Sequence, residues 1–240
     1  MAHFLKRLYP WQSFKLLSKA LLSPTETQTI TTTKPLIALS PEKAINAVEA
    51  TLAAIHLKQM KFSVQIKKSC IPNAGLGVFL KDTTQPRGTI VGFYPGTIYL
   101  PAEPVLFVSL SNQYILKCVD GLYVDGKPSG LSGRVYQSLY KRENWPGAIQ
   151  ISDMTWMDTK ILRNPLAIGQ YVNNGTSTYP ANVCYQEVDL PIAFPNDLRY
   201  LIPNMYWNPD FQLITRLVIL VSLDDIHPGE ELRSTYMDVL

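Results

Sequence analysis

The chain has 240 residues, of which 46% are apolar and 17% charged, so it is long enough for one substantial globular domain and an extension. Its three cysteines and three histidines are scattered along the sequence, which argues against a disulfide framework and a zinc cluster. The net charge of +3 is uneven: residues 1–61 carry eight Lys/Arg against three Asp/Glu, and residues 62–240 carry fourteen against sixteen. Without a basic excess in the second region we expect no direct nucleic-acid binding, and its mild acidity suits a lysine-rich peptide.

Residues 1–36 are predicted to form a basic arm and a Thr-rich linker bracketed by prolines. The first 25 residues contain four Lys/Arg and no acid, and Lys15 and Lys19 interrupt the apolar run, so neither a secretory signal nor a transmembrane helix is expected there. A mitochondrial presequence and an ordinary basic arm both fit this composition. We therefore expect an intracellular protein of the nucleus or cytoplasm, or of the mitochondrion if the arm is a presequence.

An N-terminal helix is predicted within residues 37–61. Ser40 stands at a capping position, Pro41 suits the first helical position, and Glu42 favours the positive end of the helix dipole. The apolar positions that follow at spacings of three, four and three form one stripe: Ile45, Val48, Leu52 and Ile55. We expect this helix to pack on the domain rather than to perform chemistry.

Residues 62–240 are predicted to form a β-rich domain of many short strands. Short apolar bursts rich in β-branched and aromatic residues alternate there with Gly, Pro, Asn and Asp. The clearest strand candidates are residues 77–80, 89–94, 113–119, 121–126, 182–188 and 217–223. Two inserts interrupt the pattern, a less regular one at 127–165 with room for one or two helices and a loop at 195–212.

Three segments carry the functional information, although each also has an ordinary structural interpretation. Residues 74–79 read Ala-Gly-Leu-Gly-Val-Phe, residues 164–187 contain Tyr-Val-Asn-Asn-Gly, and residues 226–236 end in Gly-Glu-Glu-Leu-Arg-Ser-Thr-Tyr. Taken singly they fit a glycine-rich hairpin turn, an Asn-Gly turn between strands, and a last strand with a packed tyrosine. In this order the segments resemble the signature segments of a SET domain, over roughly residues 64–236.

The resemblance implies S-adenosyl-L-methionine as cofactor and assigns residues to it. Asn173 matches the family asparagine that helps to hold the amino-acid end of the cofactor, with Asn174 beside it and Tyr236 also in contact. Asn174 and Gln170 depart from the family pattern, in which His and Arg are usual. The glycine-rich segment is expected to contact the cofactor mainly through its main chain, at Ala74, Gly75, Leu76, Gly77 and Val78.

The resemblance also implies a protein-lysine N-methyltransferase whose lysine channel is lined by the catalytic tyrosines Tyr236, Tyr94 and Tyr185. A free lysine has a pKa of about 10.4, so only about one in a thousand is the neutral nucleophile near pH 7.4. A narrow apolar channel disfavours the ammonium form, and alignment of the amine then drives an in-line displacement. No metal is required.

The expected fold is therefore mainly β (α+β), a SET domain of short twisted sheets with a threaded C-terminal segment and an N-terminal helical extension. The expected partner is a protein that presents a lysine, histone or non-histone. Many SET enzymes complete the site with a cysteine-bound zinc module after the final tyrosine, whereas four residues follow Tyr236 here. The alternative hypothesis is thus a degenerate SET fold that binds its ligands without turnover.

Overall fold

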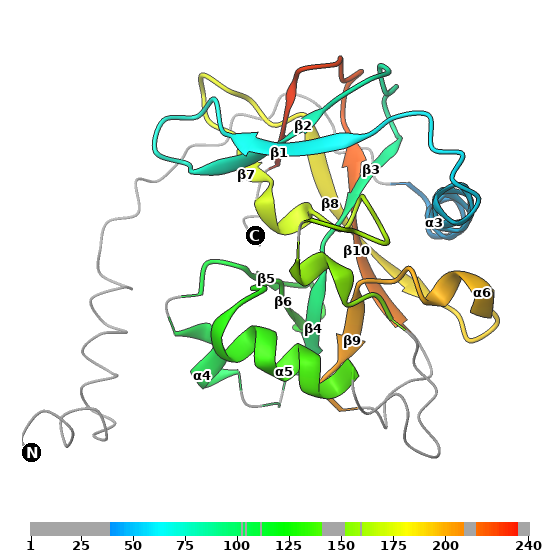
Figure 1. Cartoon of the computed structure of the whole chain (residues 1–240), viewed down its shortest axis with the longest axis vertical. Helices are drawn as coiled ribbons and strands as arrows, with labels where there is room; N and C mark the ends of the chain where they lie inside the picture. The colour runs from blue at the N-terminus through cyan, green and yellow to red at the C-terminus, as the bar shows by residue number, and fades with distance from the viewer. Residues whose placement is uncertain are drawn as a thin grey trace, which may run out of the picture. The chain divides into compact units, whose positions relative to one another are not determined.

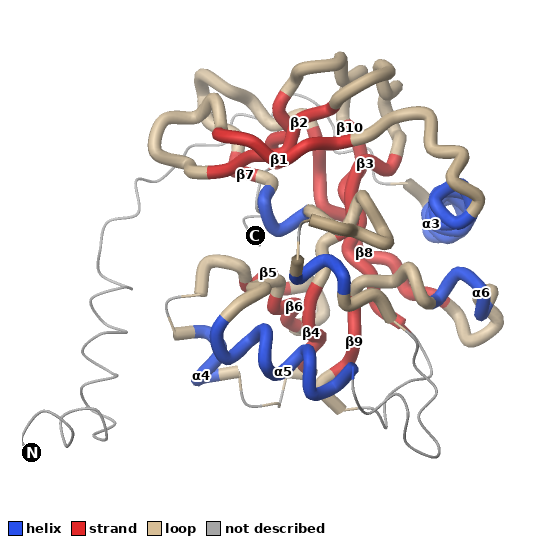
Figure 2. Tube along the Cα trace, in the orientation of Figure 1, coloured by secondary structure: helices blue, strands red, loops and turns tan. Residues whose placement is uncertain are grey.

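The computed structural model describes residues 39–101, 103, 105–110, 112–140, 152–158, 160–208 and 215–234. These residues form two β-sheets with few helices (Figure 1, Figure 2). The mainly β class with an N-terminal helix is therefore confirmed. In the part of the chain that the structure describes, no helix is long and apolar enough to cross a membrane. The predicted arm and linker lie outside the described residues.

The larger sheet has seven strands. In sheet order the path is β1 (Val64–Lys68), β2 (Leu76–Leu80), β11 (Glu231–Ser234), β8 (Val183–Leu190), β10 (Thr215–Ser222) and β3 (Ile90–Phe93), with β7 (Asn173–Asn174) paired to β11. All eight residues of β10 are buried, which explains its nearly continuous run of Leu, Val and Ile. Strand β11 lies between β2 and β8 in the sheet and also pairs with β7, so it is inserted among strands that precede it in the sequence.

The smaller sheet has four strands. Its order is β5 (Ile115–Lys117), β6 (Tyr123–Asp125), β4 (Gly96–Tyr99) and β9 (Asn204–Tyr206). Helix α5 (Gly130–Tyr140) packs against β4 and β9 (Figure 1) and buries Tyr136 and Leu139 there. Gly96 has a φ of +143°, and a Cβ on it would come within 2.2 Å of the Asp125 carbonyl oxygen, so only glycine fits between these strands. Helix α4 (Leu106–Ser109) lies in the connection between β4 and β5.

Helix α3 (Pro41–His56) packs on the larger sheet through β8 and β3 and also contacts α6 (Asn196–Arg199) (Figure 1). Its buried stripe differs by one position from the predicted one, because Ala44 is buried and Ile45 only partly so. The other buried residues are Val48, Leu52 and Ile55, as predicted. Ser40 occupies the N-cap position, but its side chain makes no capping hydrogen bond, so that part of the prediction is wrong.

Each of the six predicted strand segments overlaps a strand of the structure, with ends that differ by up to two residues. The stretch at 195–212 is not simply a loop, since it holds α6 and the strand β9, which pairs in parallel with β4. The stretch at 127–165 holds α5 and a short 3-10 turn, η2 (Thr155–Met157). The predicted domain limits at 36 and 61 remain predictions.

Arg216 on β10 joins the larger sheet to the turn between β5 and β6. Its guanidinium donates to Asp120 at 2.7 Å, to Glu187 at 2.6 Å and to Asp189 at 2.6 and 3.1 Å. Burial alone would lower the pKa of Arg216, but hydrogen bonds and charges from Asp189 and Asp120 outweigh it and raise the pKa above its usual value. The guanidinium is therefore a fixed positive charge that holds three carboxylates from two parts of the fold.

Replacing Arg216 by methionine should lower the free energy of unfolding by about 2 kcal/mol, because the carboxylates lose their shared partner. The loss falls short of that for a fully buried pair, because the side chains of Asp120 and Asp189 are 46% and 49% exposed and can be hydrated. Urea denaturation of the variant measures it. Arg134→Met, on an exposed position of α5, is the control and should change stability by less than about 0.5 kcal/mol. Equal effects of the two substitutions would contradict the proposed role of the network.

Candidate active site

The glycine-rich segment forms the end of a β-hairpin. Strands β1 and β2 pair up to Lys68 and Leu76, and Gly75 turns the chain with a φ of +77°, a conformation that favours glycine. The Ser69 amide donates to the Gly75 carbonyl at 2.9 Å and closes the loop. The hairpin interpretation of this segment is therefore correct, and the cofactor contacts predicted for residues 74–78 remain predictions.

Gly77 is required for a different reason, because a buried carboxylate lies directly against it. A Cβ at Gly77 would come within 2.1 Å of Glu231 Oε1 and within 3.2 Å of Asn173 Nδ2. Glu231 is only 1% exposed. It accepts hydrogen bonds from Ser69 Oγ at 2.6 Å, the Cys70 amide at 2.8 Å and Asn173 Nδ2 at 3.1 Å. One carboxylate thus joins the hairpin loop, β7 and β11.

Asn173 connects β7 to this carboxylate and to the hairpin. Its Nδ2 donates to the Leu76 carbonyl at 2.8 Å as well as to Glu231, so both amide hydrogens are used within the protein. Its Oδ1 accepts no hydrogen bond from the described residues and stays available as an acceptor. The side chain is partly exposed, and that of Asn174 is exposed. Asn173 can therefore hold the hairpin and accept an N–H from a ligand at the same time.

The Asn-Gly pair at 174–175 is not a hairpin turn, so that interpretation is wrong. Asn173 and Asn174 pair in parallel with Arg233 and Ser234 of β11, and the Gly175 amide donates to the Ser234 carbonyl at 2.7 Å. Neither Asn174 nor Gly175 has the positive φ that a type I′ turn requires. Strand β11 therefore lies beside Asn173 and Asn174, and the described residues of this segment end at Ser234. Tyr236 lies outside the described residues.

The two other predicted catalytic tyrosines lie together. Tyr94 follows β3 and is completely buried, and Tyr185 on β8 is 6% exposed. Their rings meet edge to face, with centroids 5.8 Å apart and planes at 81°. Strand β10 lies between β3 and β8 and aligns them, since the Tyr94 amide donates to Val218 and Tyr185 pairs with Leu220. The sheet register therefore brings residues 91 positions apart in sequence into contact.

Both hydroxyl groups donate to main-chain carbonyls. Tyr94 donates to Tyr114 at 2.8 Å and Tyr185 to Gly169 at 3.4 Å. A phenolic oxygen that has donated its proton keeps lone pairs that accept hydrogen bonds, and aromatic rings attract cations. The pair is thus chemically suited to orient an amine or ammonium group.

A single segment links the tyrosine pair to the Glu231 cluster. The turn η3 (Gly169–Tyr171) receives the Tyr185 hydroxyl at its first residue, and the chain then reaches Asn173 in β7. The structure therefore joins the predicted cofactor residues and the predicted lysine-channel residues through five consecutive residues.

Glu231 was not predicted as a site residue. The sequence contains two adjacent glutamates, and nothing in their pattern distinguishes the buried Glu231 from the exposed Glu230, whose carboxylate accepts from the His227 amide at 2.7 Å. The glycine at position 77 is the one signal that points to a close neighbour, and it does not identify that neighbour.

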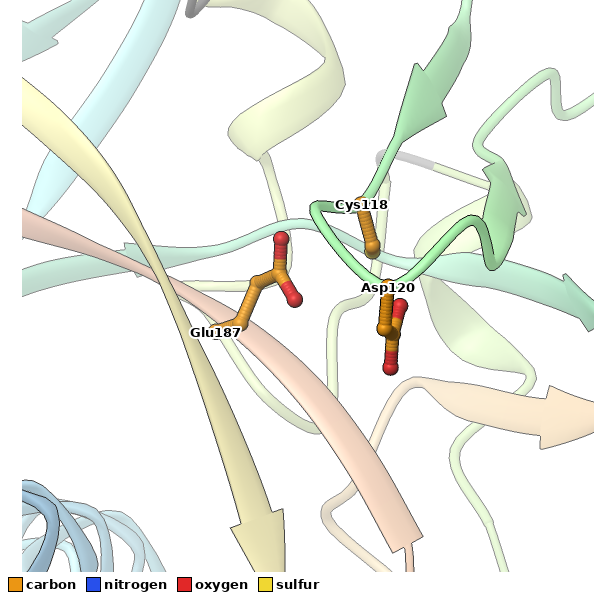
Figure 3. A group of neighbouring side chains, drawn as sticks. All are labelled: Cys118, Asp120 and Glu187. Carbon is orange, nitrogen blue, oxygen red and sulfur yellow. The ribbon is translucent and has the colours of Figure 1, made fainter. Parts of the chain in front are cut away.

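One group of side chains has the spacing of metal ligands. The ligand atoms of Cys118, Asp120 and Glu187 lie within 4.8 Å of one another (Figure 3). Burial, and then Glu187, raise the pKa of the Cys118 thiol to about 12, so it is protonated at neutral pH. Arg216 already neutralises both carboxylates. The ion-pair network accounts for this group, and we assign no metal to it.

Comparison with known proteins identifies the class. No family model matches the chain. A human protein named SET domain-containing protein 9 is 44% identical over 186 residues, which cover 78% of this chain and 62% of that protein. Its counterpart from Pongo abelii is 43% identical over 186 residues, or 78% of this chain and 67% of that protein. The chain therefore belongs to the SET domain proteins, in the family of SET domain-containing protein 9.

This confirms the resemblance drawn from the three sequence segments. The chain spans roughly two thirds of the length of these curated relatives. A solved structure described as "ctPRC2 in an autoinhibited conformation bound to S-adenosylmethionine" aligns with a TM-score of 0.42 at 15% identity, over 85% of this chain and 20% of that one.

Substituting alanine for Gly77 should lower the free energy of unfolding by about 2–3 kcal/mol, because the new methyl group would displace the Glu231 carboxylate from its three donors. Urea denaturation measures the loss. Gly92→Ala in the same sheet is the control, because its Cβ would come no closer than 3.4 Å to the flexible end of Ile168. If Gly77→Ala proved no more destabilising than Gly92→Ala, the close packing of Glu231 against position 77 would be wrong.

Proposed function

We propose that this chain is an S-adenosyl-L-methionine-dependent protein-lysine N-methyltransferase. The observation that carries the proposal is the junction at Glu231, where the glycine hairpin, Asn173 and the strand leading to Tyr236 are held together in a chain of the SET family. This junction and the Tyr94–Tyr185 pair lie at the two ends of one short segment. In this proposal the junction at Glu231 is the cofactor side of the site and the tyrosine pair is its amine side.

The residues at the junction fit the cofactor. The Asn173 Oδ1 is an acceptor suited to the ammonium of its amino-acid end, and the main chain of residues 74–78 offers close approach where Gly75 lacks a side chain. Glu231 is a buried anion whose hydrogen-bond donors at Ser69 and Cys70 are neutral, which favours a cationic ligand nearby. When bound, S-adenosyl-L-methionine supplies an electrophilic methyl group on a positively charged sulfur.

The tyrosines act on the lysine. A lysine side chain that enters beside Tyr94 and Tyr185 leaves water, and desolvation lowers the pKa of its ammonium group. The phenolic oxygens accept N–H bonds and turn the nitrogen lone pair toward the methyl donor. Tyr236 completes the channel in this proposal. The rate enhancement then comes mainly from alignment, without a covalent intermediate.

Two measurements test the function. Calorimetric titration with S-adenosyl-L-methionine should show binding, and tritiated methyl groups should be transferred to lysine residues of proteins in a cell lysate. Binding without transfer would favour the alternative of a SET-fold binding module, and absence of binding would contradict both hypotheses.

Asn173→Ala should weaken cofactor binding about 5- to 150-fold, which corresponds to the loss of one buried polar partner at about 1–3 kcal/mol. Titration calorimetry on the folded variant measures it. Asn182→Ala is the matched control. Its side chain donates to the Glu231 carbonyl at 2.9 Å and accepts from the Arg233 amide at 2.8 Å, so it supports the main chain of β11 instead. It should lower stability but change cofactor affinity less; unchanged affinity in folded Asn173→Ala would contradict the assignment of this asparagine.

Tyr236→Phe should reduce methyl transfer about 100-fold, because it removes a transition-state contact worth about 3 kcal/mol. The thermal midpoint should stay nearly unchanged, since only one oxygen is lost and the ring can still pack. Single-turnover transfer of the tritiated methyl group gives the rate. Tyr123→Phe, on β6 of the smaller sheet, is the control and should keep full activity. Full activity of Tyr236→Phe in an active background would make Tyr236 a packing residue.

A further inference from the structure

Gln170 is a buried amide whose polar atoms make no hydrogen bond of acceptable geometry within the part of the chain that the structure describes. Its side chain belongs to a residue that is only 4% exposed, and neither Nε2 nor Oε1 forms a hydrogen bond with the described residues. A buried amide that is left unpaired is costly, and such groups in native proteins usually serve a ligand or bind water. The main chain of η3 is held by hydrogen bonds from the Tyr171 amide to the Ile168 carbonyl at 3.0 Å and from the Val172 amide to the Gly169 carbonyl at 3.1 Å.

The main chain fixes where this amide lies. A Cβ on the preceding Gly169 would come within 2.8 Å of the Phe93 carbonyl oxygen and 3.0 Å of Tyr94 Cα, so η3 is pressed against the end of β3. A Cβ on Gly126 would come within 2.9 Å of Tyr94 Cε1 and 3.2 Å of Gln170 Cβ. Gln170 therefore leaves the main chain beside the edge of the Tyr94 ring, which itself contacts Tyr185.

One further hydroxyl group, that of Tyr171, lies near the same amide. The pKa of Tyr171 is raised by burial first and by Tyr114 second, and Gln170 lowers it. The Tyr171 hydroxyl and the Gln170 amide are thus close enough for a side-chain polar contact, although the amide atoms do not reach the geometry of a hydrogen bond with any described residue. The carbonyl of Tyr114 is the acceptor of the Tyr94 hydroxyl. The surroundings of Gln170 are consequently aromatic and polar.

We propose that the Gln170 carboxamide binds the acceptor amine and selects amines that still carry an N–H. This inference rests on the proposed function for the identity of the ligand as a lysine side chain. The Oε1 atom accepts an N–H of the amine beside Tyr94 and Tyr185, and as a neutral acceptor it stabilises the ammonium form less than a carboxylate would. A trimethylated ammonium has no N–H to donate, so it would leave the buried amide unpaired. Gln170 therefore favours unmethylated and partly methylated lysine over trimethyllysine.

The test compares Gln170→Met with Gln186→Met. Methionine has nearly the length of glutamine without its polar atoms. Gln186 on β8 is a glutamine whose amide is hydrogen-bonded: Nε2 donates to the Leu39 carbonyl at 2.7 Å and Oε1 accepts from the Leu39 amide at 2.8 Å. Removing an unpaired amide should leave the thermal midpoint unchanged or raise it, whereas Gln186→Met should lower it. A fall in Gln170→Met as large as that in Gln186→Met would show that the amide is satisfied within the folded protein, by water or by another segment, and would overturn the proposal.

Binding of Nε-methyllysine and Nε-trimethyllysine, followed by NMR titration of the full chain, supplies the second readout. The wild type should prefer the monomethylated amine about tenfold, as expected for one hydrogen bond to a buried group. Gln170→Met should abolish this preference, and Gln186→Met should retain it. An unchanged preference in Gln170→Met, or no binding of either amine to the wild type, would overturn the proposal.

A third variant separates this inference from the proposed function. Gln170→Glu places a charge beside the amine and stabilises the ammonium form, so the pH at which methyl transfer is half maximal should rise. If the wild type transfers methyl groups and both Gln170 variants keep its amine preference and pH profile, the proposed methyltransferase function stands and the proposed role of Gln170 is wrong. If amine binding is selective and depends on Gln170 but no methyl transfer occurs, the role of Gln170 is supported and the proposed enzymatic activity is contradicted.

Discussion

The buried carboxylate of Glu231 is the interaction on which the arrangement of the site depends. A charge that is withdrawn from water must be hydrogen-bonded, and its partners here come from the hairpin loop and from β7, far from it in sequence. None of the three segments can move without leaving either this carboxylate or one of its donors unpaired. The absence of a side chain at Gly77 is what admits the carboxylate. Gly77 is therefore needed for the packing of Glu231 on β11, whether or not the hairpin also contacts a ligand.

The buried charges of Glu231 and Arg216 differ in their partners. Arg216 is surrounded by three carboxylates and forms a closed network that links the two sheets. Glu231 is held by an amide, a hydroxyl and a side-chain amide, and within the described part of the chain no Lys or Arg forms an ion pair with it. Its negative charge is thus stabilised by dipoles but not neutralised by a cation, so it interacts electrostatically with any charged ligand nearby. That asymmetry favours a cationic ligand at the junction and gives the Arg216 network a structural role.

The sequence predicted those parts of the fold that depend on local pattern. Apolar bursts located six strands, and the spacing of Val48, Leu52 and Ile55 located the helix that covers the sheet. Strand β9 was missed because Asn204–Tyr206 lies among prolines and polar residues and becomes a strand only by pairing with β4. The Asn-Gly pair at 174–175 suggested a turn, but parallel pairing with β11 outweighs that local preference. Burial of Glu231 and Gln170 depends on long-range packing, which no local pattern encodes.

The spacing between the two halves of the proposed site is set by η3 and β7. At one end, Gly169 packs closely against the end of β3, next to Tyr94 of the Tyr94–Tyr185 pair. At the other end, Asn173 is hydrogen-bonded to the hairpin and to Glu231. Because both ends of this segment are fixed by packing that tolerates no extra atoms, the distance between the amine side and the cofactor side cannot adjust freely. An in-line transfer depends on that distance more than on acid–base groups. In the proposed mechanism, the close packing at Gly169 and Gly77 therefore constrains the geometry of methyl transfer together with the tyrosines.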